Sequence, residues 1–234
     1  FGVRHIIARA AEDFAAIKDF SADLPVVSVV GEIYVRLDEF SNGFIAERLA
    51  ERGLRPILAP FIEWLEYTTY VQKQRLQEGI PLPGDNAVAA QVTYALQAGI
   101  IDRLYGEMGR ALGWGKRTTV DASIKAAAPY IDRALMGEAV LTLGGPTYEH
   151  AAGRIDGVVA VGPLECMPNK IAEAQFCHVA ERQGLIALTL GLNGEPLDPE
   201  MLDNFAYEVK EHHARRRQAA AQRGQRFAPP DLMP

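Results

Sequence analysis

Four short apolar runs, each followed by a helix-like segment, constrain the fold of this chain most. The runs are rich in β-branched residues and are bounded by glycine or proline, which is typical of buried strands. In chain order they are LPVVSVVGEIYV at 24–35, LRPILAP at 54–60, IDGVVAVGP at 155–163 and LIALTLG at 185–191. Strands that alternate with helices pair in parallel through right-handed crossovers. The sequence therefore predicts an α/β fold, a doubly wound parallel sheet of about four strands.

A long stretch without a strand interrupts this alternation. Residues 87–136 predict two helices, separated by the loop GWGKRTTVD. The next segment, at 137–154, fits either a strand or a helix broken by glycine and proline, and we favour the helix. We therefore expect a single α/β domain over residues 1–215, with a helical insertion at about 80–150. Residues 216–234 predict a flexible C-terminal tail.

Charge and hydrophobicity exclude several classes of protein. The formal net charge of −6 argues against broad nucleic-acid binding, because such proteins need a basic surface to neutralise phosphates. No apolar run approaches the roughly 20 residues that span a bilayer, and the N-terminus has no signal-peptide pattern. We therefore expect a cytoplasmic protein without nucleic-acid or membrane partners. The chain begins at Phe1 instead of Met, which favours a piece of a longer protein.

Loops after the strands are the expected place for a ligand, because open doubly wound sheets bind ligands beyond the carboxyl ends of their strands. The loop after the first strand contains Glu32, Tyr34 and Arg36, which would form a polar cofactor-binding site if they project beyond the sheet. Glu32 has an equally good alternative role as the cap of the next helical turn. The chain contains neither GxxxxGK[ST] nor a GxGxxG that opens a helix after a strand, so no phosphate-binding motif supports this site.

The loop after the third strand contains Cys166, one of two cysteines. Pro168 suits the first turn of the following helix, whose amides and positive dipole end would favour a thiolate at Cys166. Such a thiolate could bind a metal or attack an electrophile; the alternative is a small, packed, inert residue. The adjacent Glu165, a further candidate for cofactor binding, opposes a thiolate by its charge.

The second cysteine, Cys177, cannot share a metal centre with Cys166. Eleven residues separate the two on one predicted helix, which places them about 14 to 16 Å apart. We expect Cys177 to be a core residue, and His212 and His213 to be solvated at a polar helix end. Because an iron–sulfur cluster takes about four cysteine ligands, Cys166 alone does not complete one.

Three segments of the chain resemble a known family. They are GEIYVRLDEFSNGFIAERLAERGLRPILAPFIEWLEY at 31–67, GEAVLTLGGPTYEHAAGRIDGVVAVGPLECMPNKIAEAQF at 137–176 and GLIALTLGLNGEPLDPEMLDNFAYEV at 184–209. Together they resemble the C-terminal part of large 2-hydroxyglutaryl-CoA dehydratase activase-related proteins, also called CoA-substrate-specific enzyme activases. That part is similar to the dehydratase D-component and to benzoyl-CoA reductase subunits. The resemblance covers roughly residues 25–210, and its most specific motifs are GEIYVR and GPxxCMP.

The resemblance implies flavodoxin-like α/β domains and, in the related dehydratases, a low-potential [4Fe–4S] cluster held by cysteines from more than one domain. Cys166 would be one ligand of that cluster. The family also carries ATPase modules of the acetate kinase/actin type, which couple ATP hydrolysis to electron transfer onto a dehydratase or reductase. This chain has no recognisable ATPase module and lacks the other cysteines. We therefore expect it neither to hydrolyse ATP nor to assemble a cluster alone.

These observations lead to three hypotheses for function. In the first, the chain belongs to an activator of an (R)-2-hydroxyglutaryl-CoA dehydratase-type protein, supports ATP-driven electron transfer and contributes one iron–sulfur ligand. Its partners would be the rest of the parent chain, with the ATPase modules, and a 2-hydroxyacyl-CoA dehydratase. In the second, it is a non-catalytic scaffold that docks those modules or a partner subunit through the helical insertion and the exposed ends of the sheet. In the third, it is a CoA- or nucleotide-binding domain that uses the strand ends.

Overall fold

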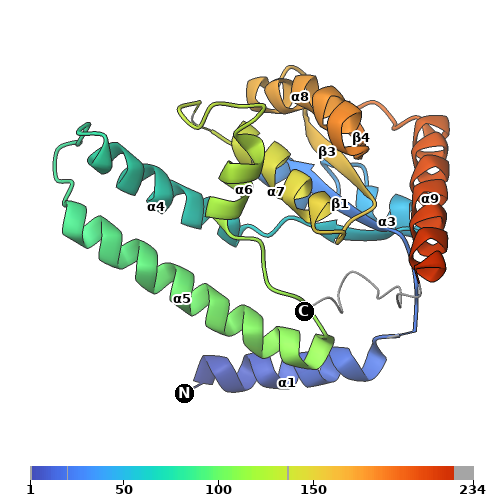
Figure 1. Ribbon diagram of the computed structural model, residues 1–234, viewed down its shortest axis with the longest axis horizontal. Coiled ribbons are helices and arrows are strands. Elements are labelled where there is room, and N and C mark those ends of the chain that lie inside the picture. The colour runs from blue at the N-terminus through green and yellow to red at the C-terminus, as the bar shows by residue number, and fades with distance from the viewer. Residues whose placement is uncertain (1, 20, 136, 224–234) are drawn as a thin grey trace. The chain divides into compact units, whose positions relative to one another are not determined.

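The computed structural model describes residues 2–19, 21–135 and 137–223, which form two compact units. The sheet unit comprises Asp23–Ala59 and the described residues from 121 to 223. The helical unit comprises the described residues up to 22 together with Pro60–Val120. Figure 1 shows both units and labels most of their elements. The chain therefore enters the sheet unit twice, once on each side of residues 60–120.

The sheet unit contains a four-stranded parallel sheet in the order β2-β1-β3-β4. Its strands are β1 (Val26–Gly31), β2 (Arg55–Leu58), β3 (Gly157–Pro163) and β4 (Ile186–Leu192). In the register of the sheet, Val29 of β1 lies opposite Leu58 of β2 and Val159 of β3. The sheet is thus built outward in both directions from its central β1–β3 pair, which confirms the predicted doubly wound, flavodoxin-like fold.

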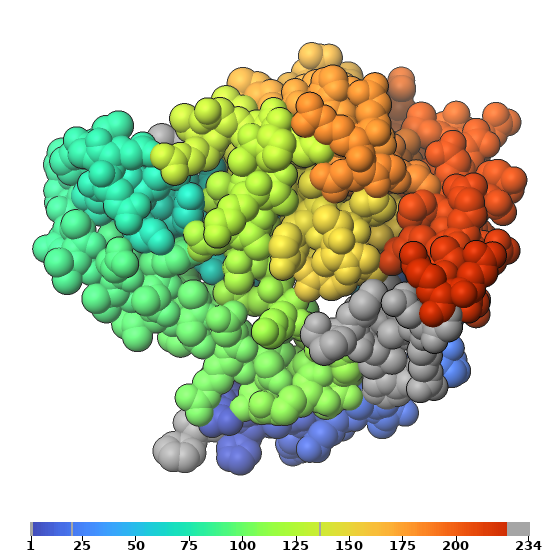
Figure 2. All heavy atoms as spheres, in the orientation of Figure 1, coloured from blue at the N-terminus to red at the C-terminus, as the bar shows by residue number. Residues whose placement is uncertain are grey.

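Helices cover both faces of this sheet (Figure 1). On one face lie α7 (Ala139–Ala151) and α8 (Met167–Gln183), and Figure 2 shows their yellow and orange side chains covering the strands from that side. On the other face lie α3 (Ile45–Glu51) and α9 (Pro199–Gln222). All six residues of β1 are buried between the two layers. This double coverage explains why the first strand is a continuous apolar run in the sequence.

Alternate residues of the central strands face opposite layers, as the pleat of a strand requires. Val27 and Val29 of β1 belong to the core beneath α3 and α9, together with Val159 and Val161 of β3. Each of the four is 0% exposed. Burying one such side chain stabilises a fold by about 1.5 to 3 kcal/mol. The β1–β3 pair is therefore the most strongly anchored part of the sheet.

The ambiguous segment at 137–154 forms a helix, as we predicted, although Pro146 lies inside α7. A proline at this place removes one backbone hydrogen bond. Tertiary packing compensates for that loss: eight residues of α7 are buried. Gly144 permits the closest of these contacts, because a Cβ there would lie 2.0 Å from the carbonyl oxygen of Ser123 in α6 (Val120–Ala127).

The last helix extends further than the sequence predicts. α9 continues to Gln222, past residue 216 where the predicted flexible tail begins. Ala220 is buried, and the run of alanines at 219–221 has high helix propensity. The remainder of the predicted tail, residues 224–234, lies outside the described residues.

The described helical unit consists of α1 (Gly2–Ile17), α4 (Ile62–Gln77) and α5 (Ala87–Leu112), with α1 and α4 both packed against α5. The predicted insertion covers about 80–150, whereas the second segment of the observed helical unit is Pro60–Val120. Helix α7, which the predicted insertion included, packs on the sheet. None of the described helices is long and apolar enough to cross a bilayer.

Arg117 links α4 to α5. Its guanidinium donates to both carboxylate oxygens of Glu66, at 2.7 and 3.1 Å, and its Nε donates to Asp102 at 2.6 Å. Burial by itself lowers the pKa of Arg117, but the hydrogen bonds and charges of the two carboxylates outweigh burial and raise that pKa. Glu66 is only 1% exposed, so its carboxylate relies on the guanidinium for charge compensation.

We expect Arg117→Met to lower the free energy of unfolding of the helical unit by about 3 kcal/mol, because the buried carboxylate of Glu66 would lose its counter-charge. Asp102→Asn is the matched control: the Asp102 side chain is 59% exposed, so its ion pair contributes less than about 1 kcal/mol. Urea-dependent hydrogen exchange at α4 amides measures both changes. Equal losses in the two variants would contradict the role given to Glu66.

Candidate functional site

The switch point of the sheet is the place where the carboxyl ends of β1 and β3 adjoin. From there the chain leaves β1 toward α3 on one face and leaves β3 toward α8 on the other, which is where doubly wound folds bind ligands. The Glu32 N–H donates to the carbonyl oxygen of Val161 at 2.9 Å and holds the two strands together. The five sequence-predicted residues all lie on the two segments that follow, at 32–36 and 165–166.

Glu32 caps the helix that follows β1. Its carboxylate accepts hydrogen bonds from the N–H of Tyr34 at 3.1 Å and of Val35 at 2.8 Å, at the start of α2 (Ile33–Leu37). Two of the first amides of α2 are thus occupied by a carboxylate of the chain itself. The capping role of Glu32 is therefore the one observed, and binding of a cofactor by Glu32 stays a prediction.

Glu138 is a site residue that the sequence analysis missed. It precedes α7 and stands near Glu32 and Arg36 at the carboxyl edge of the sheet. Burial raises the pKa of Glu138, the charge of Glu32 raises it further, and the charge of Arg36 together with the hydrogen bond from Ile33 opposes them. An acidic residue just before a helix that returns to the sheet is the signal that could have identified it, because such a helix begins at the carboxyl edge.

We expect Glu138→Gln to raise the free energy of unfolding at pH 7 by a few tenths of a kcal/mol, since the site is partly exposed and screened. The folded state holds the Glu138 proton more tightly than the unfolded state, so the wild type loses stability as pH rises from 4.5 through the raised pKa. Glutamine imitates the protonated form and avoids this loss. Urea unfolding at pH 4 and pH 7 measures the gain in free energy of unfolding of Glu138→Gln over the wild type. An equally large gain at both pH values would contradict the titration of Glu138.

The remaining residues after β1 differ in their accessibility. Arg36 is 3% exposed, whereas Tyr34, two residues earlier on α2, is 66% exposed. The structure therefore brings Glu32, Arg36 and Glu138 together in one charged group, and Tyr34 lies outside it on the surface. Cofactor binding by Tyr34 and Arg36 stays a prediction.

Cys166 is the N-cap residue of α8. Its side chain makes no capping hydrogen bond, and its thiol belongs to a partly exposed residue. The exposed Glu165 before it has a left-handed backbone with φ of 64°, a conformation that costs a non-glycine residue about 1 to 2 kcal/mol. Backbone strain of this kind gathers at functional sites. The turn thus presents an uncommitted thiol at a helix N-terminus, as the sequence predicts.

A second polar side chain in this turn, that of Asn169, was also missed. Asn169 is 4% exposed, and its Oδ1 has no hydrogen-bond partner among the described residues. At the third position of a helix a Glu or Gln side chain often accepts from the N-cap N–H, but here the N–H of Cys166 donates to the carbonyl oxygen of Pro163 at 3.0 Å. Its side chain packs against Gly162, where a Cβ would lie 3.0 Å from Nδ2. An unusual pair, a free N-cap thiol and a buried amide oxygen, therefore marks the start of α8.

The prediction that Cys177 is a core residue is wrong. Cys177 is exposed, and its Sγ donates to the carbonyl oxygen of Ala174 at 3.1 Å. The buried face of α8 is formed by Ala172, Phe176 and Val179, at helical spacing. Cys177 directly follows Phe176, so the 100° turn per residue moves its side chain off that face. The separation from Cys166 on one continuous helix agrees with the prediction that the two cannot share a metal.

The described residues contain no group of three or more His, Cys, Asp or Glu side chains that could hold a metal ion. Cys166 thus belongs to no such group in the part of the chain that the structure describes. No protein-family model matches this chain, and no curated protein or solved structure is significantly similar to it. The geometry of the site is therefore the basis for interpreting its function.

Proposed function

We propose that this chain supplies one thiolate, Cys166, to an iron–sulfur cluster whose other ligands come from the rest of an activase-type protein or from its partner. The chain would then support ATP-driven, low-potential electron transfer onto a 2-hydroxyacyl-CoA dehydratase. The observation that carries the proposal is the uncommitted, partly exposed thiol of Cys166 at the N-terminus of α8, beside the switch point.

The donor fits such a cluster as one ligand. Thiolates are the usual ligands of iron–sulfur clusters, and hydrogen bonds to the sulfurs tune their potentials. Cys166 would hold one iron, and the first amides of α8 would face its sulfur because the N-cap side chain lies beside them. When bound, the cluster would supply a one-electron carrier at this edge of the sheet. Since a cluster takes about four ligands, the proposal requires a shared site.

Anaerobic reconstitution of the intact parent polypeptide with iron and sulfide tests this role. We expect Cys166→Ser to lose most of the bound iron and visible absorbance, because serine is a poor ligand for iron–sulfur clusters. Cys177→Ser is the control: it removes a thiol from the exposed side of the same helix and should leave the iron content unchanged. Full iron content in Cys166→Ser, or no cluster in the wild type together with its dehydratase, would exclude the proposed role.

Docking of a partner is the second candidate, and one observation favours it. The helical unit has an open apolar groove of about 860 Å³, lined by side chains of α1, α4 and α5 and by Trp114.

The third hypothesis, a CoA- or nucleotide-binding domain, is opposed by the contacts at the end of β1. Two amides of α2 that would face a phosphate already bind the Glu32 carboxylate, so an anion there would have to displace this carboxylate.

A further inference from the structure

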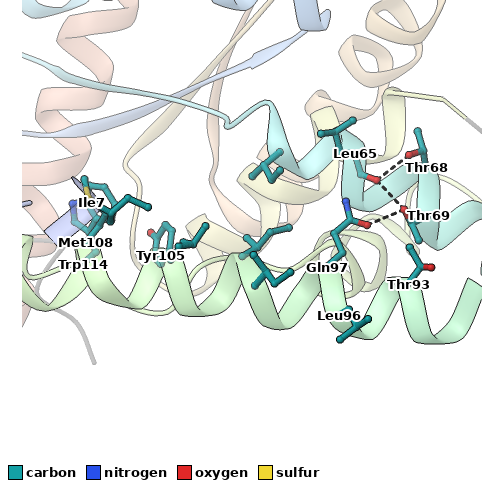
Figure 3. A pocket seen from close by; sticks show the side chains of 14 residues that line it. Ile7, Leu65, Thr68, Thr69, Thr93, Leu96, Gln97, Tyr105, Met108 and Trp114 are labelled. Atoms are coloured by element: carbon teal, nitrogen blue, oxygen red, sulfur yellow. Dashed lines mark hydrogen bonds between the residues drawn. The ribbon is translucent and has the colours of Figure 1, made fainter. Parts of the chain in front are cut away.

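The apolar groove of the helical unit runs along α5. Figure 3 shows Leu65 and Thr69 of α4 near one end of it, and Ile7, Met108 and Trp114 near the other. The side chains that line it are mostly aliphatic or aromatic, and its polar ones, three threonines and Gln97, are uncharged. Every lining residue belongs to the helical unit. The groove is therefore a property of this unit by itself.

A row of apolar residues recurs at every fourth position of α5. Its exposed members are Val88 (73%), Val92 (50%), Leu96 (62%) and Ile100 (59%). Leu96 and Ile100 line the groove, and the row continues there with Leu104 and Met108. Residues four apart are neighbours on the surface of a helix, so Leu96, Ile100 and Leu104 form one apolar ridge. A ridge of this kind normally packs against another element. Contiguous exposed apolar surface marks an interaction site.

The length of the groove suits an α-helix lying along it. Its floor extends from Thr93 to Met108, about 22 Å at 1.5 Å per residue. Pockets for small ligands surround most of the ligand, whereas more than half of the surface of Leu96 and of Ile100 is open to water. The shape thus favours a helix over a small molecule.

The groove also continues a helix–helix interface that the unit already contains. α1 packs on α5, Ala11 of α1 is 1% exposed, and the Lys18 ammonium donates to the carbonyl oxygen of Leu112 at 2.7 Å. Ile7 of α1 lines the end of the groove where Met108 lies. A helix in the groove would therefore extend the layer that α1 begins, on a surface of α5 whose packing partner is already helical.

Polar contacts hold the walls of the groove in place. The Thr69 hydroxyl of α4 donates to the side-chain oxygen of Gln97 of α5 at 2.9 Å, inside the groove. Arg117 binds Glu66 of α4 and Asp102 of α5 nearby in the same unit. Because these contacts order α4 and α5 before a partner arrives, binding has less entropy to lose.

We propose that this groove binds an amphipathic α-helix of a partner protein, whose apolar residues at i, i+4 and i+7 pack on Leu96, Ile100 and Leu104. This inference rests on the docking candidate and does not depend on Cys166, because all of its contacts lie in the helical unit. The partner would be recognised by the spacing of its apolar side chains, and its opposite, polar face would remain in water.

Selection of displayed random peptides against the full chain tests the proposal. We expect the enriched peptides to carry apolar residues at helical spacing, and a labelled synthetic copy to gain helicity on binding. Ile100→Glu should weaken its binding by about tenfold or more, because a carboxylate would be buried against the apolar face of the peptide. Ile80→Glu is the matched control, since Ile80 is also 59% exposed but lies outside the groove; its affinity should equal that of the wild type.

Four results would overturn the proposal. One is enrichment of peptides without helical spacing, and another is equal binding by Ile100→Glu and the wild type. The third is a wild-type dimer in sedimentation that Ile100→Glu dissociates, since the occupant would then be a second copy. The fourth is displacement of palmitate without any peptide binding, since the occupant would then be a lipid. Leu96→Glu provides a second variant at a 62% exposed position. None of these readouts involves iron, so failure here is distinct from failure of the role of Cys166.

Discussion

Replacing Asp156 with alanine is expected to lower the free energy of unfolding by about 4 kcal/mol. Asp156 is 0% exposed at the amino end of β3. Its carboxylate accepts from the Val26 N–H at 2.9 Å and pairs with His213 at 3.0 Å and with Arg216 at 2.6 Å. Alanine would remove the carboxylate that links α9 to the two central strands. The basic side chains of His213 and Arg216 would then lose their buried acidic partner.

Urea unfolding followed by circular dichroism measures this loss. Asp203→Ala is the matched control: Asp203 also pairs with an arginine, Arg52, at 2.7 Å, but its side chain is 63% exposed. Exposed ion pairs contribute less than about 1 kcal/mol. If both variants lose the same amount, burial of the network around Asp156 does not stabilise the fold.

The same carboxylate makes the stability of the fold depend on acid. Burial by itself raises the pKa of Asp156, but hydrogen bonds from His213 and Val26 and the charges of His213 and Arg216 outweigh it and lower the pKa. The unfolded state therefore binds this proton more readily than the folded state. The stabilisation is present above the unfolded pKa, about 3.9, and is lost as pH falls through the lower folded value. Over that range the wild type should lose more stability than Asp156→Ala.

Gly31→Ala is the second change with a large expected effect, a loss of about 2 to 5 kcal/mol. Gly31 has φ of 114°, a conformation that L side chains rarely adopt, and its Cβ would lie 1.9 Å from the carbonyl oxygen of Val161. Left-handed strain costs about 1 to 2 kcal/mol, and overpacking a core costs about 1 to 3 kcal/mol more. The strands cannot separate without breaking the hydrogen bond from Glu32 to Val161.

Gly184→Ala isolates the two contributions to that loss. Gly184 also has positive φ, 73°, but no atom lies within 4 Å of the Cβ position. Alanine there should cost only about 1 to 2 kcal/mol, the backbone strain alone. Comparing urea midpoints of both variants with the wild type gives the steric part by difference. A difference near zero would show that the approach of β1 to β3 does not require glycine at position 31.

The sheet could be predicted from the sequence because its strands are buried on both faces. Such strands become continuous apolar runs such as VVSVV at 26–30, which are easily distinguished from amphipathic helices. The turn at Cys166 was predictable for a similar reason: proline after it and glycine at 184 mark the limits of α8. Each of these signals lies within or next to the element that it marks, so a single sequence is enough to detect it.

Two of the misses, His213 and Glu138, share a physical cause, which is dependence on partners far away along the chain. His213 looks solvated in the polar run EVKEHHARRRQ, yet it is 4% exposed. It is buried because Asp156 and Asp23 compensate its polar ring from 57 and 190 residues away. Glu138 joins Glu32 only because α7 returns to the edge where β1 ends. The periodicity of apolar residues identifies the buried face of a helix, but it does not identify the residues that this face contacts.

The carboxylate cap of α2 has a consequence for the electrostatics of the sheet edge. Nucleotide-binding folds offer free amides and a positive helix end at this position, whereas the carboxylate of Glu32 occupies two of those amides here. Its negative charge lies where a phosphate would bind, so this edge of the sheet repels free phosphate esters.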